Sequence, residues 1–115
     1  MLLKINLLIV FLFSVLTTFA QTDTGEKTHT KLIKVSNNIY MLQGKGGNIG
    51  LSFGNDGVFM IDDQYAEGWE QIQEDIKRVS DKPIKFLVNT HFHGDHTGAN
   101  SALAKTGTVI FSQDN

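Results

Sequence analysis

Residues 86–96 read FLVNTHFHGDH, so that an apolar run leads directly into three histidines and an aspartate. Imidazole and carboxylate groups at this spacing are typical metal ligands. If residues 85–90 form a strand, the alternation of side chains places His91 and His93 on one face. Two ring nitrogens on one face can share one metal ion, and the stretch therefore predicts a metal site at the end of this strand.

The last three residues of the stretch add a second pair of donors. Gly94 lacks a Cβ and permits a sharp turn, which would bring Asp95 and His96 to a point beside the first pair. The stretch is therefore more typical of two adjacent metal sites than of one. The alternative is a solvated polar loop, but with only 4 histidines in 115 residues such a cluster is rare by chance. His29 lies alone in a polar segment and is interpreted as a surface residue.

The pattern His-x-His-x-Asp-His after an apolar run resembles the hallmark of the metallo-β-lactamase superfamily. Two upstream segments extend the resemblance, which covers residues 32–112. Residues 58–62, VFMID, resemble the family's buried strand that ends in an aspartate, and residues 47–50, GNIG, resemble an earlier hairpin. Ala99 stands where many relatives have a second glycine, which is a mild departure from the pattern.

The resemblance implies a role for each of these side chains. His91 and His93 would bind a first zinc ion, and Asp95 and His96 a second. Asp95 would also be catalytic, because it would orient the hydroxide that two metal ions generate from water. Asp62 would support the metal ligands from behind without touching the metal. The implied reaction is hydrolysis of an ester, thioester or lactam carbonyl in a small-molecule substrate.

Zinc is the expected metal because imidazole and carboxylate ligands suit it, although the same donors can hold iron or manganese. Iron would imply a different reaction in the same fold, the oxygenation of a persulfide. The sequence contains no cysteine, which removes zinc-thiolate sites and disulfides. His96 argues against the β-lactamase subclass that replaces this ligand. It leaves open β-lactamases with only His and Asp ligands, thioesterases and lactonases.

Family members complete both metal sites with ligands from the second half of a duplicated fold. No histidine follows His96 in this sequence, and Asp114 is the only later carboxylate. We therefore expect these residues to be the N-terminal portion of a longer enzyme whose missing C-terminal half is needed to complete the site. The alternative is a non-catalytic short form, or a metal-binding fragment, that catalyses nothing by itself.

The first 20 residues have the layout of a signal peptide. Lys4 precedes an apolar stretch at residues 5–16, and small residues stand before position 21. The apolar stretch is short for a helix that crosses a membrane, so we expect export to the periplasm or secretion, with no stable membrane span after cleavage. The alternative is an uncleaved anchor. Residues 21–30 are polar and predict a flexible leader.

Residues 31–115 predict a partial domain of the α/β class, the N-terminal half of an αββα sandwich in which a mixed sheet carries helices on one face. We expect strands at residues 32–35, 38–42, 48–53, 58–61, 85–90 and 108–111, and helices at residues 65–80 and 98–105. Half a sandwich would leave one sheet face with exposed apolar surface, which predicts poor solubility. The net charge of -2, without a basic stretch, argues against a nucleic-acid partner.

Two further features are interpreted as structural. The glycine-rich residues 44–47, GKGG, lack the spacing of a phosphate-binding loop and predict a hairpin tip. The family resemblance implies that such a loop can lie near the mouth of the active site, where Lys45 would touch substrate. Asp62 and Asp63 are neighbours in the sequence and are expected to point in opposite directions. Asp63 is therefore assigned no role.

Overall fold

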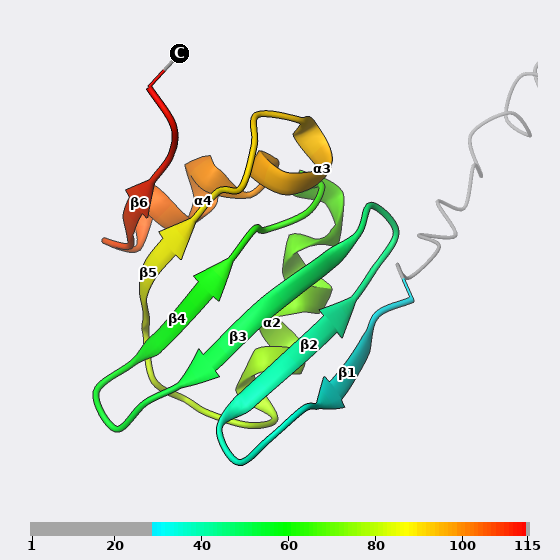
Figure 1. Ribbon diagram of the computed structural model, residues 1–115, viewed down its shortest axis with the longest axis vertical. Helices are drawn as coiled ribbons and strands as arrows, with labels where there is room; N and C mark the ends of the chain where they lie inside the picture. Colours follow the sequence, from blue (N-terminus) through cyan, green and yellow to red (C-terminus); the bar gives the residue numbers. More distant parts are fainter. Residues whose placement is uncertain (1–28, 115) are drawn as a thin grey trace, which may run out of the picture.

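Strands of one mixed sheet make up the framework of residues 29–114, the part of the chain that the computed structural model describes. In order across the sheet they are β1 (Lys31–Lys34), β2 (Ile39–Gln43), β3 (Asn48–Phe53), β4 (Val58–Ile61), β5 (Ile84–Val88) and β6 (Val109–Phe111). Neighbours from β1 to β4 pair antiparallel, whereas β4, β5 and β6 are parallel (Figure 1). The predicted signal peptide and residues 21–28 of the predicted leader lie outside the described residues.

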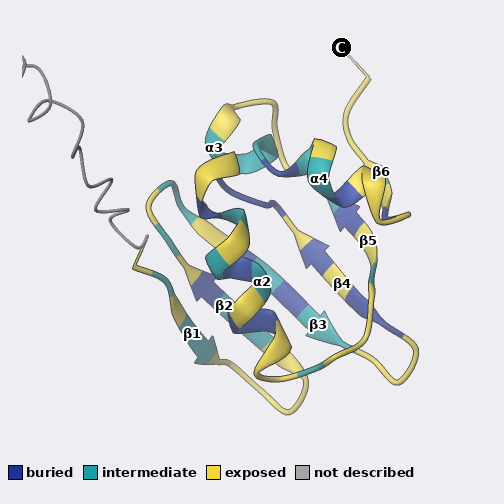
Figure 2. Ribbon diagram, turned by 180° about the vertical axis from the view of Figure 1, so that it is seen from behind, coloured by how far each residue is buried: buried dark blue, intermediate teal, exposed yellow. Residues whose placement is uncertain are grey.

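The helices lie against one face of this sheet. They are the short helix η1 (Ala66–Gly68) and the α-helices α2 (Trp69–Lys77), α3 (Gly94–Thr97) and α4 (Asn100–Lys105). Figure 2, seen from behind, shows α2 in front of the central strands and α4 near β5 and β6. The predicted α/β class, with a mixed sheet and helices on one face, is confirmed. Within the described residues no helix has the length and apolar character needed to cross a membrane.

The core lies between the helices and the sheet face that they cover. Leu51, Met60 and Leu87 are direct neighbours across β3, β4 and β5, and each is at most 2% exposed. From the helices, Ile72 and Ile76 occupy the same core, as their spacing of four residues predicts. Among the described residues, the buried apolar side chains of this core are Leu42, Ile49, Leu51, Val58, Met60, Ile72, Ile76, Leu87, Ala99 and Leu103. Burial of each large apolar side chain contributes about 1.5–3 kcal/mol.

The opposite sheet face is apolar but open to solvent in the described part of the chain. Alternation along each strand places every second side chain there, and strand pairing aligns these side chains into rows. The large apolar residues on it that remain 38% to 52% exposed are Ile39, Phe59, Ile61, Phe86, Val109 and Phe111. An apolar surface of this kind is typical of a contact surface, as half a sandwich predicts.

The structure differs from the sequence-based expectation just after β5. The predicted strand at residues 85–90 ends at Val88. The backbone N–H of Asn89 still donates to the oxygen of Phe111 at 2.9 Å, and the backbone leaves the sheet at Thr90. The side chain of Asn89 donates to the backbone oxygen of His96 at 3.0 Å, and the backbone N–H of Thr90 donates to a carboxylate oxygen of Asp62 at 2.7 Å. The histidines that follow therefore lie in a loop, and the argument from strand alternation does not apply to them. The turn expected after residue 93 is the short helix α3.

Candidate metal centre

The segment at residues 91–96, which carries the histidine and aspartate motif, lies at the carboxyl ends of two parallel strands. Asp62 follows β4 and His91 comes shortly after β5, so parallel pairing brings both residues to the same edge of the sheet. The backbone N–H of Asp62 continues the pairing by donating to the oxygen of Val88 at 2.9 Å. In open α/β sheets, this edge is where ligands usually bind.

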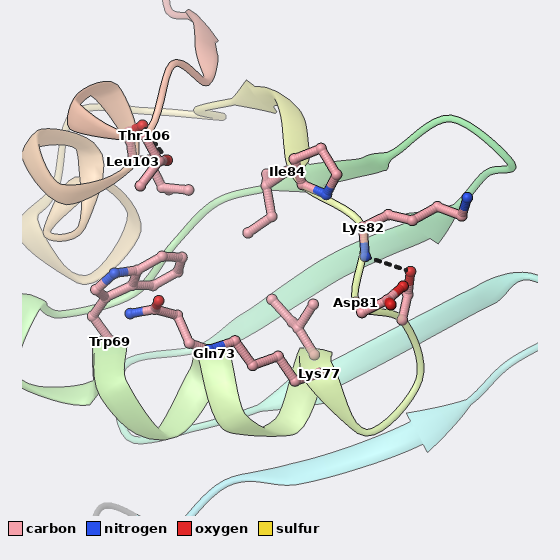
Figure 3. A pocket seen from close by; sticks show the side chains of 11 residues that line it. Trp69, Gln73, Lys77, Asp81, Lys82, Ile84, Leu103 and Thr106 are labelled. Carbon is pink, nitrogen blue, oxygen red and sulfur yellow. Dashed lines mark hydrogen bonds between the residues drawn. The ribbon is translucent and has the colours of Figure 1, made fainter.

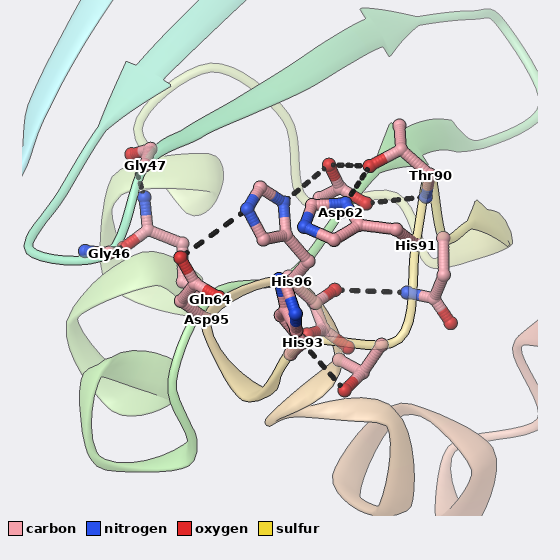
Figure 4. Close-up of polar contacts among 12 residues, drawn as sticks. Gly46, Gly47, Asp62, Gln64, Thr90, His91, His93, Asp95 and His96 are labelled. Carbon is pink, nitrogen blue, oxygen red and sulfur yellow. Dashed lines mark hydrogen bonds and ion pairs between the residues drawn. The ribbon is translucent and has the colours of Figure 1, made fainter.

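Three of the four predicted metal ligands meet in one cluster. One donor atom each from His91, Asp95 and His96 lies within 4.8 Å of the other two. The rings of His91 and His96 are 3.9 Å apart between centroids (Figure 4). His93 stands outside this cluster, with its ring 4.9 Å from that of His91 in an edge-on arrangement. The structure thus brings three of the proposed donors together and places the fourth beside them.

Asp62 and Thr90 determine which nitrogen each clustered histidine presents. Asp62 accepts hydrogen bonds from the hydroxyl of Thr90 and from Nδ1 of His96, both at 2.8 Å. Since the Thr90 hydroxyl gives its single proton to Asp62, it can only accept from Nδ1 of His91, 2.9 Å away. Both histidines therefore carry their proton on Nδ1 and offer the lone pair of Nε2. The Nε2 of His96 lies 3.4 Å from a carboxylate oxygen of Asp95.

The environment of Asp62 favours its charged form. Burial alone would raise the pKa of Asp62, but hydrogen bonds from the Thr90 backbone, His96 and the Thr90 hydroxyl outweigh burial and lower it. Its backbone adopts the left-handed region, with φ at 60°. Asp62 therefore supplies a fixed negative charge in contact with the imidazole of His96.

Asp63 faces away from the cluster, into the protein interior. Its side chain is fully buried and accepts one hydrogen bond, from the backbone N–H of Ala99 at 3.1 Å. The other carboxylate oxygen has no partner among the described residues. Burial raises the pKa of Asp63 to about 6, more than the hydrogen bond from Ala99 lowers it. Asp63 thus anchors the turn before α4, and the two aspartates occupy opposite environments.

Two residues of this site were not predicted from the sequence. Thr90 bonds both Asp62 and His91, and its place between a strand and a histidine was the only available signal. Gln64 contacts the backbone of the loop at residues 44–47, which is the predicted hairpin tip between β2 and β3. No sequence signal indicates this contact, because Gln64 is far from the loop in sequence.

One cavity among the described residues adjoins the cluster. A cavity of about 470 Å³ is lined by His91 and Phe92 together with the polar side chains of Asn89 and Asn100. A smaller one, of about 200 Å³, lies between α2 and the start of β5, with Trp69 among its lining residues (Figure 3). None of the motif residues lines the smaller cavity, so the space next to His91 is the one that belongs to the site.

The donor set fits a zinc ion. Zinc binds imidazole nitrogen and carboxylate oxygen, and its histidine ligands usually donate their second N–H to a carboxylate or another oxygen. His96 meets this pattern through Asp62, and His91 meets it through Thr90. The fold and this cluster together define an α/β protein with a candidate metal centre at the carboxyl edge of its sheet.

Comparison with known proteins identifies the family within this class of α/β proteins. The sequence profile described as "Metallo-beta-lactamase superfamily" matches residues 34–110, and the chain belongs to that superfamily. A search of curated proteins gave no significant match.

Solved structures of metallo-beta-lactamases share the fold. FIM-1 from Pseudomonas aeruginosa, in a mono-zinc form, is 24% identical, with a TM-score of 0.65 over 75% of this chain and 43% of its own. A B3 enzyme with an active-site glutamic acid is 27% identical, with a TM-score of 0.63 over 73% and 33%. SMB-1, in complex with mercaptoacetic acid, is 25% identical, with a TM-score of 0.63 over 73% and 34%. The present chain thus spans 33% to 43% of the length of these relatives.

Proposed function

We propose that this chain carries the first part of the active site of an exported di-zinc hydrolase. The observation that carries the proposal is the meeting of His91, Asp95 and His96, whose donor atoms lie within 4.8 Å of one another. The layout of residues 1–20 supports export to the periplasm or secretion. The relatives span more sequence than this chain, which supports a C-terminal half that supplies the remaining ligands.

The metal ligands that we propose are His91, His93, Asp95 and His96. His93 is retained because its ring lies against that of His91 at the margin of the cluster. When bound, zinc supplies a more acidic water molecule and a positive charge that polarises a carbonyl oxygen. Of these ligands, Asp95 is the one we also propose as catalytic.

The protein groups around the cluster prepare it for this chemistry. Asp62 and Thr90 hold protons at Nδ1 of the two clustered histidines, which leaves Nε2 of each ring available. The side chain of Asp95 is 28% exposed, so its carboxylate can accept a hydrogen bond from water and orient it. The cavity beside His91 offers space for a small substrate next to this ligand. We propose an ester, a thioester or a lactam as the substrate class.

Zinc titration of the full chain tests the metal site. We expect His91→Ala and His96→Ala each to weaken zinc binding by about 10-fold or more, because each removes a ligand. His29→Ala is the matched control, since this histidine is exposed and lies outside the cluster. Equal zinc affinity in all four proteins would exclude the cluster as the binding site.

Activity of the native protein separates an enzyme from a non-catalytic metal-binding chain. Its intact mass shows how much sequence accompanies these residues, and its metal content distinguishes zinc from iron or manganese. We expect zinc, together with turnover of an ester, thioester or lactam that His91→Ala abolishes. Zinc binding without turnover would favour the non-catalytic alternative, and iron with persulfide oxygenation would favour an oxygenase.

A further inference from the structure

Gln64 lies close to the metal cluster, in a backbone conformation that glutamine rarely adopts. It is 4% exposed, and its backbone has a φ of 64°, in the left-handed region that side chains other than glycine rarely adopt. Residues held in this region cluster at functional sites, where the surrounding contacts maintain them. The contacts that hold Gln64 therefore indicate what it does.

The side chain of Gln64 is bonded to the hairpin loop at residues 44–47. Its Oε1 accepts a hydrogen bond from the backbone N–H of Gly46 at 3.3 Å, and its Nε2 donates to the backbone oxygen of Gly47 (Figure 4). One amide group thus uses both its acceptor and its donor on two consecutive residues of the loop. This arrangement fixes the distance between the loop and the segment after β4.

The loop held in this way lies directly against two of the proposed ligands. A Cβ placed on Gly46 would lie 2.6 Å from the Cβ of Asp95, closer than real contacts allow. A Cβ placed on Gly47 would lie 3.6 Å from Cε1 of His96, at ordinary contact distance. Any shift of the loop therefore changes the space that these two side chains occupy.

The backbone of Gln64 contacts the end of the helix that carries these two ligands. Its carbonyl oxygen accepts a hydrogen bond at 2.8 Å from the N–H of Gly98, the residue that ends α3. A Cβ on Gly98 would lie 2.5 Å from this oxygen, so only glycine permits the approach. Since α3 carries Asp95 and His96, one residue joins the loop and the helix that enclose these side chains.

We propose that Gln64 is a positioning residue that sets the geometry of Asp95 and His96 by holding the loop at residues 44–47 against them. This inference rests on the proposed function, because it concerns ligands of the proposed metal site. It goes beyond that function by assigning the loop and Gln64 a part in metal affinity. Neither of them contributes a donor atom to the cluster.

Two substitutions at Gln64 separate positioning from folding. Gln64→Gly removes the side chain but suits the left-handed backbone, so the fold should be kept. Gln64→Glu keeps an acceptor for the N–H of Gly46 but cannot donate to Gly47. Gln43→Ala is the matched control, because Gln43 is exposed and lies at the end of β2, next to the same loop.

Cobalt titration followed by visible absorption gives the first readout in the full chain. We expect Gln64→Gly to weaken Co²⁺ binding by about 10- to 100-fold and to shift the absorption bands, with a smaller effect for Gln64→Glu. Gln43→Ala should match the wild type in both. Unchanged affinity and bands in Gln64→Gly, with the wild type binding Co²⁺, would overturn the inference and leave the proposed function standing.

Amide hydrogen exchange and the imidazole signals of His96, both measured without metal, give a second readout. We expect Gln64→Gly to speed exchange at Gly46 and to move the His96 signals, while far-UV circular dichroism stays unchanged. If the wild type bound no Co²⁺ but these changes appeared, the metal function would fail and the positioning contact would stand. If exchange and signals did not change, the contact itself would be excluded.

Discussion

The two faces of the sheet are built from the same strands but differ in what covers them. On the covered face, Met60 and Leu87 are fully buried beneath the helices (Figure 2). On the open face, the adjacent residues Phe59 and Phe86 are 38% and 40% exposed. The parallel strands β4 and β5 contain apolar residues in succession, which is typical of strands buried on both sides. The open face therefore has the composition of a buried surface, although no described residue covers it.

Substitution of neighbouring residues on the two faces gives the sharpest contrast and the largest effect. We expect Leu87→Ala to lower the free energy of unfolding by about 2–5 kcal/mol, because it leaves a cavity in the core. Phe86→Ala, one position earlier on the open face, should cost much less. Urea unfolding of both variants measures the difference. Equal losses would show that the open face is also covered in solution.

Asp62 lies at the sheet edge and belongs to neither face, and its replacement tests the site's own contribution to stability. Asp62→Ala leaves the Thr90 backbone, the Thr90 hydroxyl and His96 without their acceptor. We expect a loss of about 1–3 kcal/mol in urea unfolding, because three hydrogen bonds to a charged carboxylate are lost. An unchanged unfolding free energy would mean that water replaces the carboxylate.

Polar substitution on the open face should change association more than stability. Phe86→Thr keeps β-propensity and removes exposed apolar area, so unfolding should shift by less than about 1 kcal/mol. We expect a larger soluble fraction and less self-association in sedimentation velocity than for the wild type. The double variant Phe59→Thr/Phe86→Thr should extend the effect. A loss of solubility in either would contradict the assignment of this surface.

The ion pair at the far end of the sheet should have the smallest effect. Asp56 and Lys85 are 3.0 Å apart, and hydrogen bonding and charge from Lys85 lower the pKa of Asp56. A carboxyl whose pKa is lowered by folding stabilises the protein above its unfolded pKa, and this contribution disappears as pH falls through the folded value. Because Asp56 is exposed, Asp56→Asn should leave urea unfolding at pH 7 unchanged within error. A clear loss at pH 7 that vanished below pH 3 would show that the pair is stronger than exposure allows.

The sequence was sufficient for the fold because its patterns are local. Short apolar runs bounded by turn residues located the strands, and the spacing of Ile72 and Ile76 located α2. The end of β5 was missed, since it depends on the backbone of Thr90 bonding to Asp62, which is distant in the sequence. Contacts that join separate loops leave no periodic signal.

The candidate site was predictable in its donors but not in its supports. Clustering of His and Asp in one stretch indicated the metal ligands, and the family resemblance indicated Asp62. Thr90 was missed because its role depends on the direction of its hydrogen bonds, and Gln64 was missed because its role depends on a left-handed backbone. Neither property leaves a pattern in the sequence. The roles of all these residues in metal binding stay predictions until the titrations are made.

The order of the strands bears on how the protein folds during synthesis. Within residues 29–114 each strand pairs with its neighbour in the chain, so none of these strands must wait for a distant partner to emerge from the ribosome. The four-stranded antiparallel part can form first, and β5 joins it only after α2 has been made. His91 to His96 follow β5 immediately, so the donor cluster can assemble only on a sheet edge that already exists.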